Sequence, residues 1–171
     1  LGPGVRLIEP TSGNTGAALA MHAAARGIPI TLVMPENATD ERRQMLRAFG
    51  AEIVDSPADL GSNGAVELAR TMAAKDPNYV LPDQYANRAN PDMHESTTGP
   101  GIVADLPEVD VVVAGLGTGG TATGLARFFA RSKPSVAVWV AEPMPGEKVT
   151  GLRSLADGFT PEVLDDALLS G

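Results

Sequence analysis

The segment EPTSGNTG, residues 9–16, carries four short polar side chains within the five positions 11–15. They are Thr11, Ser12, Asn14 and Thr15. A strand pattern that ends at Leu7-Ile8 precedes the segment, and an Ala-rich helix pattern begins at Ala17, so the segment is predicted to open a helix. Backbone N–H groups at a helix start, with these donors and two turn-forming glycines, form a cradle for a carboxylate or a phosphate. An ordinary helix cap needs only one such residue.

A second segment, AGLGTGGTATG at residues 114–124, follows the apolar strand pattern DVVVA and precedes another helix pattern. Its glycines at 117, 119 and 120 let the backbone approach a ligand closely, while Thr118 and Thr121 add hydroxyl donors. These features are typical of a turn that binds phosphate at the start of a helix.

The second segment also permits two other interpretations. Gly115, Gly117 and Gly120 match the spacing G-x-G-x-x-G, and Glu142 follows at the end of the next strand pattern. This combination is the fingerprint of a dinucleotide site, in which the acid binds the ribose, and taken alone it would indicate NAD. The glycines can also serve tight strand-to-helix packing with no ligand bound.

Short β-rich runs alternate with amphipathic stretches along the chain, which predicts an α/β fold of βαβ units with mostly parallel sheets. Predicted strands are 30–34, 52–55, 79–81, 110–114 and 136–141; predicted helices are 40–49, 62–75, 92–105, 121–131 and a short one around 161–169. The strands at 110–114 and 136–141 are expected to be buried, with Trp139 in the core. The helix at 92–105 is expected to break near Gly99-Pro100-Gly101. The irregular stretch YANRANP, 85–91, predicts two domains, 1–87 and 88–171.

Composition narrows the classes of function. The 171 residues are 43% hydrophobic, and 13 Lys+Arg against 21 Asp+Glu give a net charge of −8. The acidic balance argues against a nucleic-acid or acidic-membrane binder, although it leaves room for a phosphate held by N–H groups. With no cysteine, disulfides, thiolate metal sites and a cysteine nucleophile are excluded. We expect neither a membrane partner nor a metal.

The two segments together resemble the fold type II pyridoxal-phosphate enzymes, because PTSGNTG is followed about a hundred residues later by GTGGT. Within that family the chain looks like the cysteine synthases. Further stretches agree: VMPENATDERRQMLRAFGAEIV, DQYANRANPDMHESTTGPGI and VAGLGTGGTATGLARF. The tail GLRSLADGF followed by TPE is most similar to the branch that uses O-phosphoserine.

The resemblance implies roles for individual residues. Asn14 would bind the ring hydroxyl of pyridoxal 5′-phosphate, and Gln84 would help at the substrate carboxylate. The cofactor phosphate would lie in the turn of Gly117, Thr118, Gly119, Gly120 and Thr121, and the carboxylate would be held by Thr11, Ser12, Gly13 and Thr15. Arg153 would bind the substrate phosphate, although a solvated loop charge is the alternative. From its position before STTGP, His94 is expected near the site but without a chemical role, and a polar supporting role is the less favoured alternative.

The implied reaction is a β-replacement that forms cysteine from O-phosphoserine or O-acetylserine and a sulfur donor, by way of an α-aminoacrylate. The partners would be the amino-acid substrate and the sulfur donor, in a cytoplasmic homodimer. The sulfur donor itself stays open. Cystathionine β-synthase or dehydratase chemistry on the same fold is the nearest alternative; an NAD-dependent oxidoreductase or a non-catalytic relative is more distant.

One departure from the family pattern concerns the lysine that binds the cofactor, which lies before the TSGNTG segment in the family. The lysines here are Lys75, Lys133 and Lys148, and none has the buried setting that lowers a lysine pKa for imine chemistry. We therefore expect a fold incomplete at both ends, no catalytic residue within this chain, and an inactive fragment. Such a fragment is expected to expose apolar sheet surface.

Overall fold

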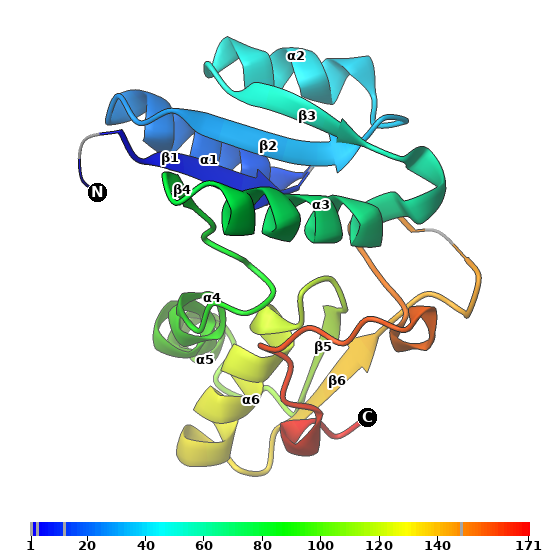
Figure 1. The fold of residues 1–171 in the computed structure, drawn as a ribbon. Coiled ribbons are helices and arrows are strands. Elements are labelled where there is room, and N and C mark those ends of the chain that lie inside the picture. Colours follow the sequence, from blue (N-terminus) through cyan, green and yellow to red (C-terminus); the bar gives the residue numbers. More distant parts are fainter. Residues whose placement is uncertain (1, 3, 12, 148) are drawn as a thin grey trace. The chain divides into compact units, whose positions relative to one another are not determined.

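The computed structural model describes residues 1–171 except Leu1, Pro3, Ser12 and Lys148. The chain divides into two compact units, residues 1–83 and 84–171. The boundary expected between residues 87 and 88 and the division after residue 83 both lie in the irregular stretch between the last strand of the first unit and the next helix (Figure 1). In the described part of the chain no helix is long and apolar enough to cross a membrane.

The first unit is a four-stranded parallel sheet with the strand order β3-β2-β1-β4. Its strands are β1 (Arg6–Pro10), β2 (Ile30–Pro35), β3 (Glu52–Ser56) and β4 (Tyr79–Val80). Its helices are α1 (Asn14–Ala25), α2 (Asp40–Ala48) and α3 (Gly61–Lys75), with one 3-10 turn, η1 (Ala58–Leu60). The predicted alternation of strands and helices is therefore confirmed here.

Helices cover both faces of this sheet, which explains why the first five residues of β2 are buried without interruption (Figure 1). Ile30, Leu32 and Met34 of β2 pack with α1 and α2. Val33 points to the other face and packs with Ile8 and with the alanines of α3. Because successive strand residues face opposite sides of the sheet, the run ITLVM contributes side chains to the hydrophobic clusters on both faces.

The second unit joins a helical run to a βαβ motif. The run is α4 (Ala89–Met93), the π-helical turn η2 (His94–Thr98) and α5 (Gly99–Asp105). The motif is β5 (Val111–Gly115), α6 (Gly120–Ser132) and β6 (Ala137–Ala141), with β5 and β6 parallel. Two 3-10 turns follow, η3 (Leu155–Asp157) and η4 (Asp166–Leu168), the second within the stretch expected as a short helix.

The predicted break near Gly99-Pro100-Gly101 is wrong, because the helical run continues through Gly99. The irregularity lies one turn earlier, in η2, where the Ser96 and Thr97 hydroxyls donate to the carbonyl of Met93. Pro100 stands in the first turn of α5, where its missing N–H costs little. Gly99 is needed for packing rather than for a break, since a Cβ there would come within 2.5 Å of the Phe128 ring.

The expectation that β5 and β6 are buried is also wrong for one face of their sheet. The covered face packs Val112 and Val138 against α5 and α6. On the opposite face Val111, Val113 and Trp139 are 53%, 65% and 45% exposed. The sequence predicted the strands from their apolar composition, but composition does not say whether both faces are covered. The expected exposure of apolar sheet surface is confirmed.

Candidate functional site

The first polar segment forms the turn from β1 into α1, and the helix begins at Asn14 rather than at Ala17. Thr11 is fixed at both its backbone and its side chain, because its N–H donates to the Val33 carbonyl and its Oγ1 accepts from the N–H of Gly13 at 3.3 Å. Gly13 is the residue that caps α1, Asn14 is exposed in the first turn, and Thr15 is half-buried. Ser12 lies outside the described residues.

This turn stands where an open parallel sheet offers a ligand site. The chain runs from β1 through β2 to β3 on one side, and then returns to place β4 on the other side of β1. Ligands of such sheets bind outside the carboxyl ends of the strands at this reversal. The segment 11–15 follows β1, and Gln84, the first residue of the second unit, follows β4.

A buried carboxylate ties the ends of β1 and β4 together within the first unit. Glu9 is fully buried, and its Oε2 accepts from the backbone N–H of Asp83 at 2.8 Å. Asp83 has a φ of 51°, in the left-handed region, and its carboxylate pairs with Arg70 at 2.9 Å. Sequence reasoning missed Glu9, although a glutamate at the end of a buried strand was a signal for a specific hydrogen bond.

In the second unit the glycine-rich segment forms the turn from β5 into α6. Gly119 caps the helix with a φ of 83°, a conformation that favours glycine. The N–H groups of the first turn of α6 and the hydroxyls of Thr118 and Thr121 are the donors available there. The partial positive charge of the helix start favours an anion at this position.

The glycines of this turn are also required by neighbouring parts of the same unit. A Cβ on Gly117 would lie 2.9 Å from the Gly151 carbonyl oxygen, and one on Gly119 would lie 2.8 Å from Leu164. A Cβ on Gly120 would overlap the side-chain amide of Asn90. Packing within the second unit therefore demands small residues at these positions.

His94 lies behind the turn, on the helical run, and contacts one of its hydroxyls. Its Nε2 is 3.1 Å from Thr121 Oγ1, and its Nδ1 is 2.9 Å from Thr98 Oγ1. Burial lowers the pKa of His94 below its usual value, because the charged imidazolium loses hydration. The neutral ring has one donor and one acceptor nitrogen, which suits contacts with two hydroxyls.

Arg153 lies in the same unit and is stacked rather than extended into solvent. Its guanidinium carbon is 4.8 Å from the centre of the Tyr85 ring and 4.5 Å from that of Phe159. The two rings meet edge to face at 5.4 Å. The Arg153 N–H donates to the carbonyl of Leu116, which directly precedes the glycine turn. The stacking fixes the plane of the guanidinium next to that turn.

Glu142, the acid of the dinucleotide interpretation, has a structural partner. Its Oε2 accepts from the Leu155 N–H at 2.8 Å, so the carboxylate holds the segment that leads to η3. Glu142 lines a hollow of about 320 Å³ together with residues of β6, η3, η4 and the C-terminus. A carboxylate engaged in this way does not favour binding of a ribose hydroxyl.

The described lysines lie on other segments than the two polar turns. Lys75 is exposed at the last position of α3, and Lys133 follows α6, where its Nζ donates to the Pro107 carbonyl. Lys148 lies outside the described residues. Neither described lysine is on a segment that follows the carboxyl end of a strand, where the polar turns are.

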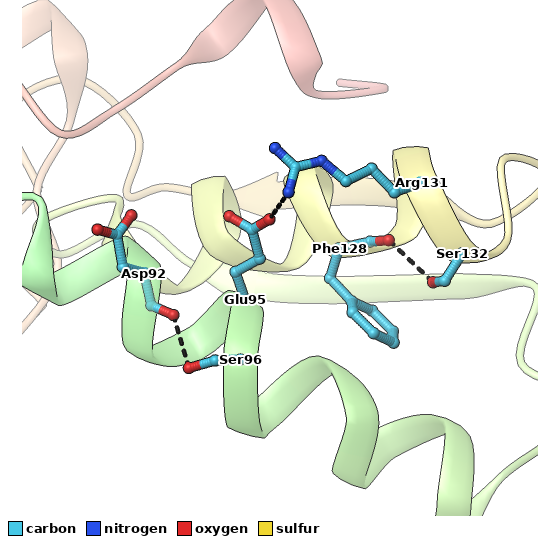
Figure 2. Close-up of a pocket in the computed structure, with 6 residues that line it drawn as sticks. All are labelled: Asp92, Glu95, Ser96, Phe128, Arg131 and Ser132. Carbon is cyan, nitrogen blue, oxygen red and sulfur yellow. Dashed lines mark hydrogen bonds and ion pairs between the residues drawn. The ribbon is translucent and has the colours of Figure 1, made fainter.

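A further hollow, of about 490 Å³, lies between the helical run and α6, on the surface that Figure 2 shows. Its polar groups are bonded to one another: Glu95 pairs with Arg131 at 2.6 Å, and Ser96 donates to the Asp92 carbonyl at 2.8 Å. Ser132 likewise donates to the Phe128 carbonyl. The hollow is therefore a feature of helix packing and presents no set of donors aimed at one point.

Taken together, the two units each offer one anion-binding turn at the carboxyl end of a parallel strand. The glycine turn has the donors that a phosphate monoester needs, while the turn before α1 has those that suit a carboxylate. Within the described residues, no three His, Cys, Asp or Glu side chains are grouped so that they could hold a metal ion. These features define an α/β protein with two polar turns at helix starts, one with donors that suit a phosphate and one with donors that suit a carboxylate.

Comparison with known proteins identifies the class more closely. Residues 2–166 match the family described as "Pyridoxal-phosphate dependent enzyme". The chain belongs to this family, whose members depend on pyridoxal phosphate, and the NAD interpretation of the glycine turn is superseded. The resemblance stated from the two motifs is thereby confirmed.

The similar curated proteins include two bacterial cysteine synthases. The chain is 42% identical to cysteine synthase A of Salmonella typhi over 99% of its length and 58% of that protein. It is 43% identical to cysteine synthase A of Escherichia coli K12 over 96% of its length and 56% of that protein. The chain thus spans little more than half the length of these relatives.

Solved structures agree with the fold. An O-ureido-L-serine synthase matches with a TM-score of 0.88 and 37% identity, covering 99% of this chain and 56% of the other. The cysteine synthase of Entamoeba histolytica matches with a TM-score of 0.86 and 31% identity, covering 99% and 53%. The predicted α/β class with parallel sheets is confirmed.

Proposed function

We propose that the protein catalyses a pyridoxal-phosphate-dependent β-replacement that forms cysteine from O-phosphoserine or O-acetylserine and a sulfur donor. The observation that carries the proposal is the glycine turn before α6, where glycines and two threonine hydroxyls adjoin the start of a helix. The identity of 42–43% to cysteine synthases supports the same reaction.

In this proposal the residues of the glycine turn, Gly117, Thr118, Gly119, Gly120 and Thr121, bind the cofactor phosphate. The residues fit the group, because a phosphate dianion accepts hydrogen bonds and the turn offers N–H and O–H donors at the positive end of α6. Asn14 binds the hydroxyl of the cofactor ring. Its exposed place in the first turn of α1 is consistent with that role.

The turn before α1 holds the carboxylate of the amino-acid substrate, through Thr11, Ser12, Gly13 and Thr15, and Gln84 assists. Thr11 is held by hydrogen bonds to Gly13 and to β2, so this residue is positioned before a ligand arrives. A fixed clamp orients the substrate for reaction and lowers the entropic part of the barrier. When bound, pyridoxal phosphate supplies the electron sink that allows the α-proton to be removed.

Arg153 is proposed to recognise the phosphate of O-phosphoserine. Its guanidinium contacts the rings of both Tyr85 and Phe159, and its backbone N–H donates to Leu116 beside the glycine turn. An arginine fixed in this way can bind phosphate oxygens with two parallel N–H donors. This arrangement favours O-phosphoserine over O-acetylserine.

The lysine that binds the cofactor is proposed to lie on a segment outside these 171 residues. Lys75 is exposed at the end of α3 and Lys133 bonds to a loop carbonyl, so neither has the desolvated setting that imine chemistry requires. By resemblance to the family, the complete protein is proposed to be a cytoplasmic homodimer that acts in cysteine biosynthesis.

The experiment is a titration of the protein with pyridoxal 5′-phosphate and, separately, with pyridoxal, followed by borohydride reduction and intact mass measurement. We expect saturable binding of the phosphorylated form, weaker binding of pyridoxal, and no covalent adduct with residues 1–171 alone. Formation of cysteine from O-phosphoserine and sulfide is expected once the remaining segments are present. Equal affinity for the two aldehydes would refute the phosphate site, and a specific adduct would show that one of these lysines reaches the cofactor.

A further inference from the structure

The helical run 89–98 lies unusually close to the first turns of α6, because two glycines of α6 face it. A Cβ on Gly120 would overlap the Asn90 amide, and one on Gly124 would lie 2.7 Å from the Cβ of His94 and 2.9 Å from the N of Glu95. The close approach lets short side chains of the run reach the glycine turn from behind. Asn90 and His94 are four residues apart in the run, so they lie on the same face of it.

The side-chain amide nitrogen of Asn90 donates two hydrogen bonds, to two different segments. Its Nδ2 donates to the Gln84 carbonyl and to Thr118 Oγ1, each at 2.9 Å. Because a carbonyl oxygen only accepts, the group that faces Gln84 must be the NH₂, and the orientation of the amide is thereby fixed. Thr118 Oγ1 therefore accepts from Asn90, and it accepts again from the Gly120 N–H at 3.3 Å.

These two bonds decide what the Thr118 hydroxyl can still do. A hydroxyl has two lone pairs and one hydrogen. With both lone pairs used inside the turn, the hydrogen remains to be donated to an outside acceptor. The Thr121 hydroxyl can likewise accept from His94 Nε2, which is 3.1 Å from its Oγ1, provided that this nitrogen carries the ring hydrogen. The hydrogen of the Thr121 hydroxyl is then also left to be donated. His94 Nδ1 would then accept from the Thr98 hydroxyl at 2.9 Å.

We propose that Asn90 and His94 are positioning residues of the glycine turn, which occupy acceptor sites on Thr118 and Thr121 so that both hydroxyls donate to one bound phosphate group. This inference rests on the proposed function, since the phosphate is that of the cofactor. The residues of the turn itself, Gly117–Thr121, carry no cationic side chain, so the direction of each O–H matters for holding a dianion. Neutral His94 serves this purpose with its hydrogen on Nε2 alone.

His94 offers a matched pair of variants. Glutamine can place an amide nitrogen near the position of Nε2, whereas asparagine reaches only as far as Nδ1. We expect His94→Gln to preserve the ratio of affinities for pyridoxal phosphate and pyridoxal to within about threefold. We expect His94→Asn to lower that ratio about tenfold, the effect of one charge-assisted hydrogen bond. Equal ratios in the two variants would overturn the role of His94.

Asn90 is tested by a cycle with Thr118. Asn90→Asp replaces the donor with an acceptor, so the Thr118 hydroxyl is drawn towards the carboxylate, and we expect the affinity ratio to fall about tenfold or more. In a Thr118→Val background the same change should alter the ratio much less, because no hydroxyl is left to redirect. The same loss in both backgrounds would contradict the mechanism and indicate a general effect of the new charge.

Two further measurements distinguish a loss of folding from a loss of the proposed hydrogen bonds. Urea unfolding without ligand reports whether a variant is folded, and nitrogen NMR of the wild-type protein reports which ring nitrogen of His94 carries the hydrogen. A hydrogen on Nδ1 in the presence of pyridoxal phosphate would overturn the proposal even if every variant failed to fold. A wild-type protein that binds pyridoxal phosphate and pyridoxal equally would refute the proposed function itself. A wild-type protein that prefers pyridoxal phosphate, with the same affinity ratio in the Asn90 and His94 variants, would refute only the positioning role of these two residues.

Discussion

The guanidinium of Arg153 lies over the ring of Phe159, with 4.5 Å between its central carbon and the ring centre. Tyr85 flanks the same guanidinium at 4.8 Å. Stacking of this kind uses the face of the guanidinium and leaves its N–H donors in a fixed plane. The two contacts restrain the guanidinium and link residues 85, 153 and 159 within the second unit.

The first prediction concerns substrate choice. Arg153→Lys keeps the charge but removes the planar fork and the stacking, so we expect the KM for O-phosphoserine to rise about 10- to 100-fold in the complete protein. The KM for O-acetylserine, which has no phosphate to bind, should change little. Steady-state kinetics with the two substrates measures both values.

Phe159→Leu is the control for this prediction. It keeps the arginine while weakening the stack, and we expect an intermediate rise in KM for O-phosphoserine. A rise of the same size for both substrates in Arg153→Lys would contradict a phosphate contact and would point to a general loss of structure.

The second prediction separates backbone strain from crowding at the glycine turn. Gly119 and Gly158 have nearly the same φ, 83° and 81°, but a Cβ on Gly119 meets Leu164, whereas one on Gly158 meets no atom within 4 Å. Gly158→Ala should therefore lower the free energy of unfolding by about 1–2 kcal/mol, which is the cost of holding alanine in the left-handed conformation. Gly119→Ala should cost about 1–3 kcal/mol more, because Leu164 must move. Urea unfolding measures both free energies.

Leu164→Ala provides the internal check on that difference. Combined with Gly119→Ala, it removes the crowded side chain, so the two changes together should cost less than the sum of their separate effects. Additive costs would show that Leu164 is not what Gly119 avoids. Gly119→Asp is expected to abolish binding of pyridoxal phosphate, since it also places a negative charge in the turn.

Much of this arrangement could be predicted from the sequence, but only where the signal was local. The run ITLVM predicted a buried strand, and β2 is buried on both faces. The polar and glycine-rich segments predicted two turns at helix starts, and both lie there, before α1 and before α6. Each of these features is encoded within about ten neighbouring residues by composition and spacing.

The remaining features depend on contacts between distant segments. Asn90 meets Thr118, and Glu9 meets Asp83, across separations of 28 and 74 residues. Gly99 looked like a helix breaker, yet it admits the Phe128 ring and the helix continues through it. A single sequence carries no periodic signal for such approaches, because they depend on how completed elements pack. The roles assigned to the site residues likewise remain predictions until variants test them.

The third prediction concerns the stability of the first unit. Arg43 is nearly buried, pairs with Asp55 at 2.6 Å, and donates to the carbonyls of Pro35 and Glu36. Arg43→Met should cost about 2–4 kcal/mol in the free energy of unfolding, because several backbone carbonyls lose a charged, largely buried donor. Arg47→Met, on an exposed position of the same helix, should cost less than about 0.5 kcal/mol.

Denaturant unfolding of the two variants checks this, and Asp55→Asn completes the set. The Asp55 side chain is half exposed, so its loss should cost much less than that of Arg43. Equal costs for Arg43→Met and Asp55→Asn would mean that the ion pair, rather than the bonds to the carbonyls, holds the loop after β2.

The fourth prediction concerns the uncovered face of the β5–β6 sheet. Val111 and Val113 are more than half exposed there, beside Trp139. Replacing both valines with threonine keeps their shape and their preference for strands while adding hydroxyls to the face. We expect binding of a hydrophobic fluorescent dye to fall by about half or more, with little change in stability. Unchanged dye binding would show that the dye reports another surface, and acrylamide quenching of Trp139 checks independently that this face is open.

The last prediction follows from the lowered pKa of His94. In the unfolded chain a histidine titrates near pH 6.5, whereas burial disfavours the charged ring in the folded protein. Below about pH 6.5 the unfolded state therefore binds more protons, so the free energy of unfolding falls as the pH is lowered and levels off below the folded pKa. His94→Gln removes this titration, and the stability difference between wild type and variant should be larger at pH 8 than at pH 5.

The control is His22→Gln on α1, where the side chain is exposed and the wild-type profile should persist. A difference that stays constant with pH would mean that the folded protein accommodates the charged and neutral forms of His94 equally well, which contradicts the expected desolvation of the ring.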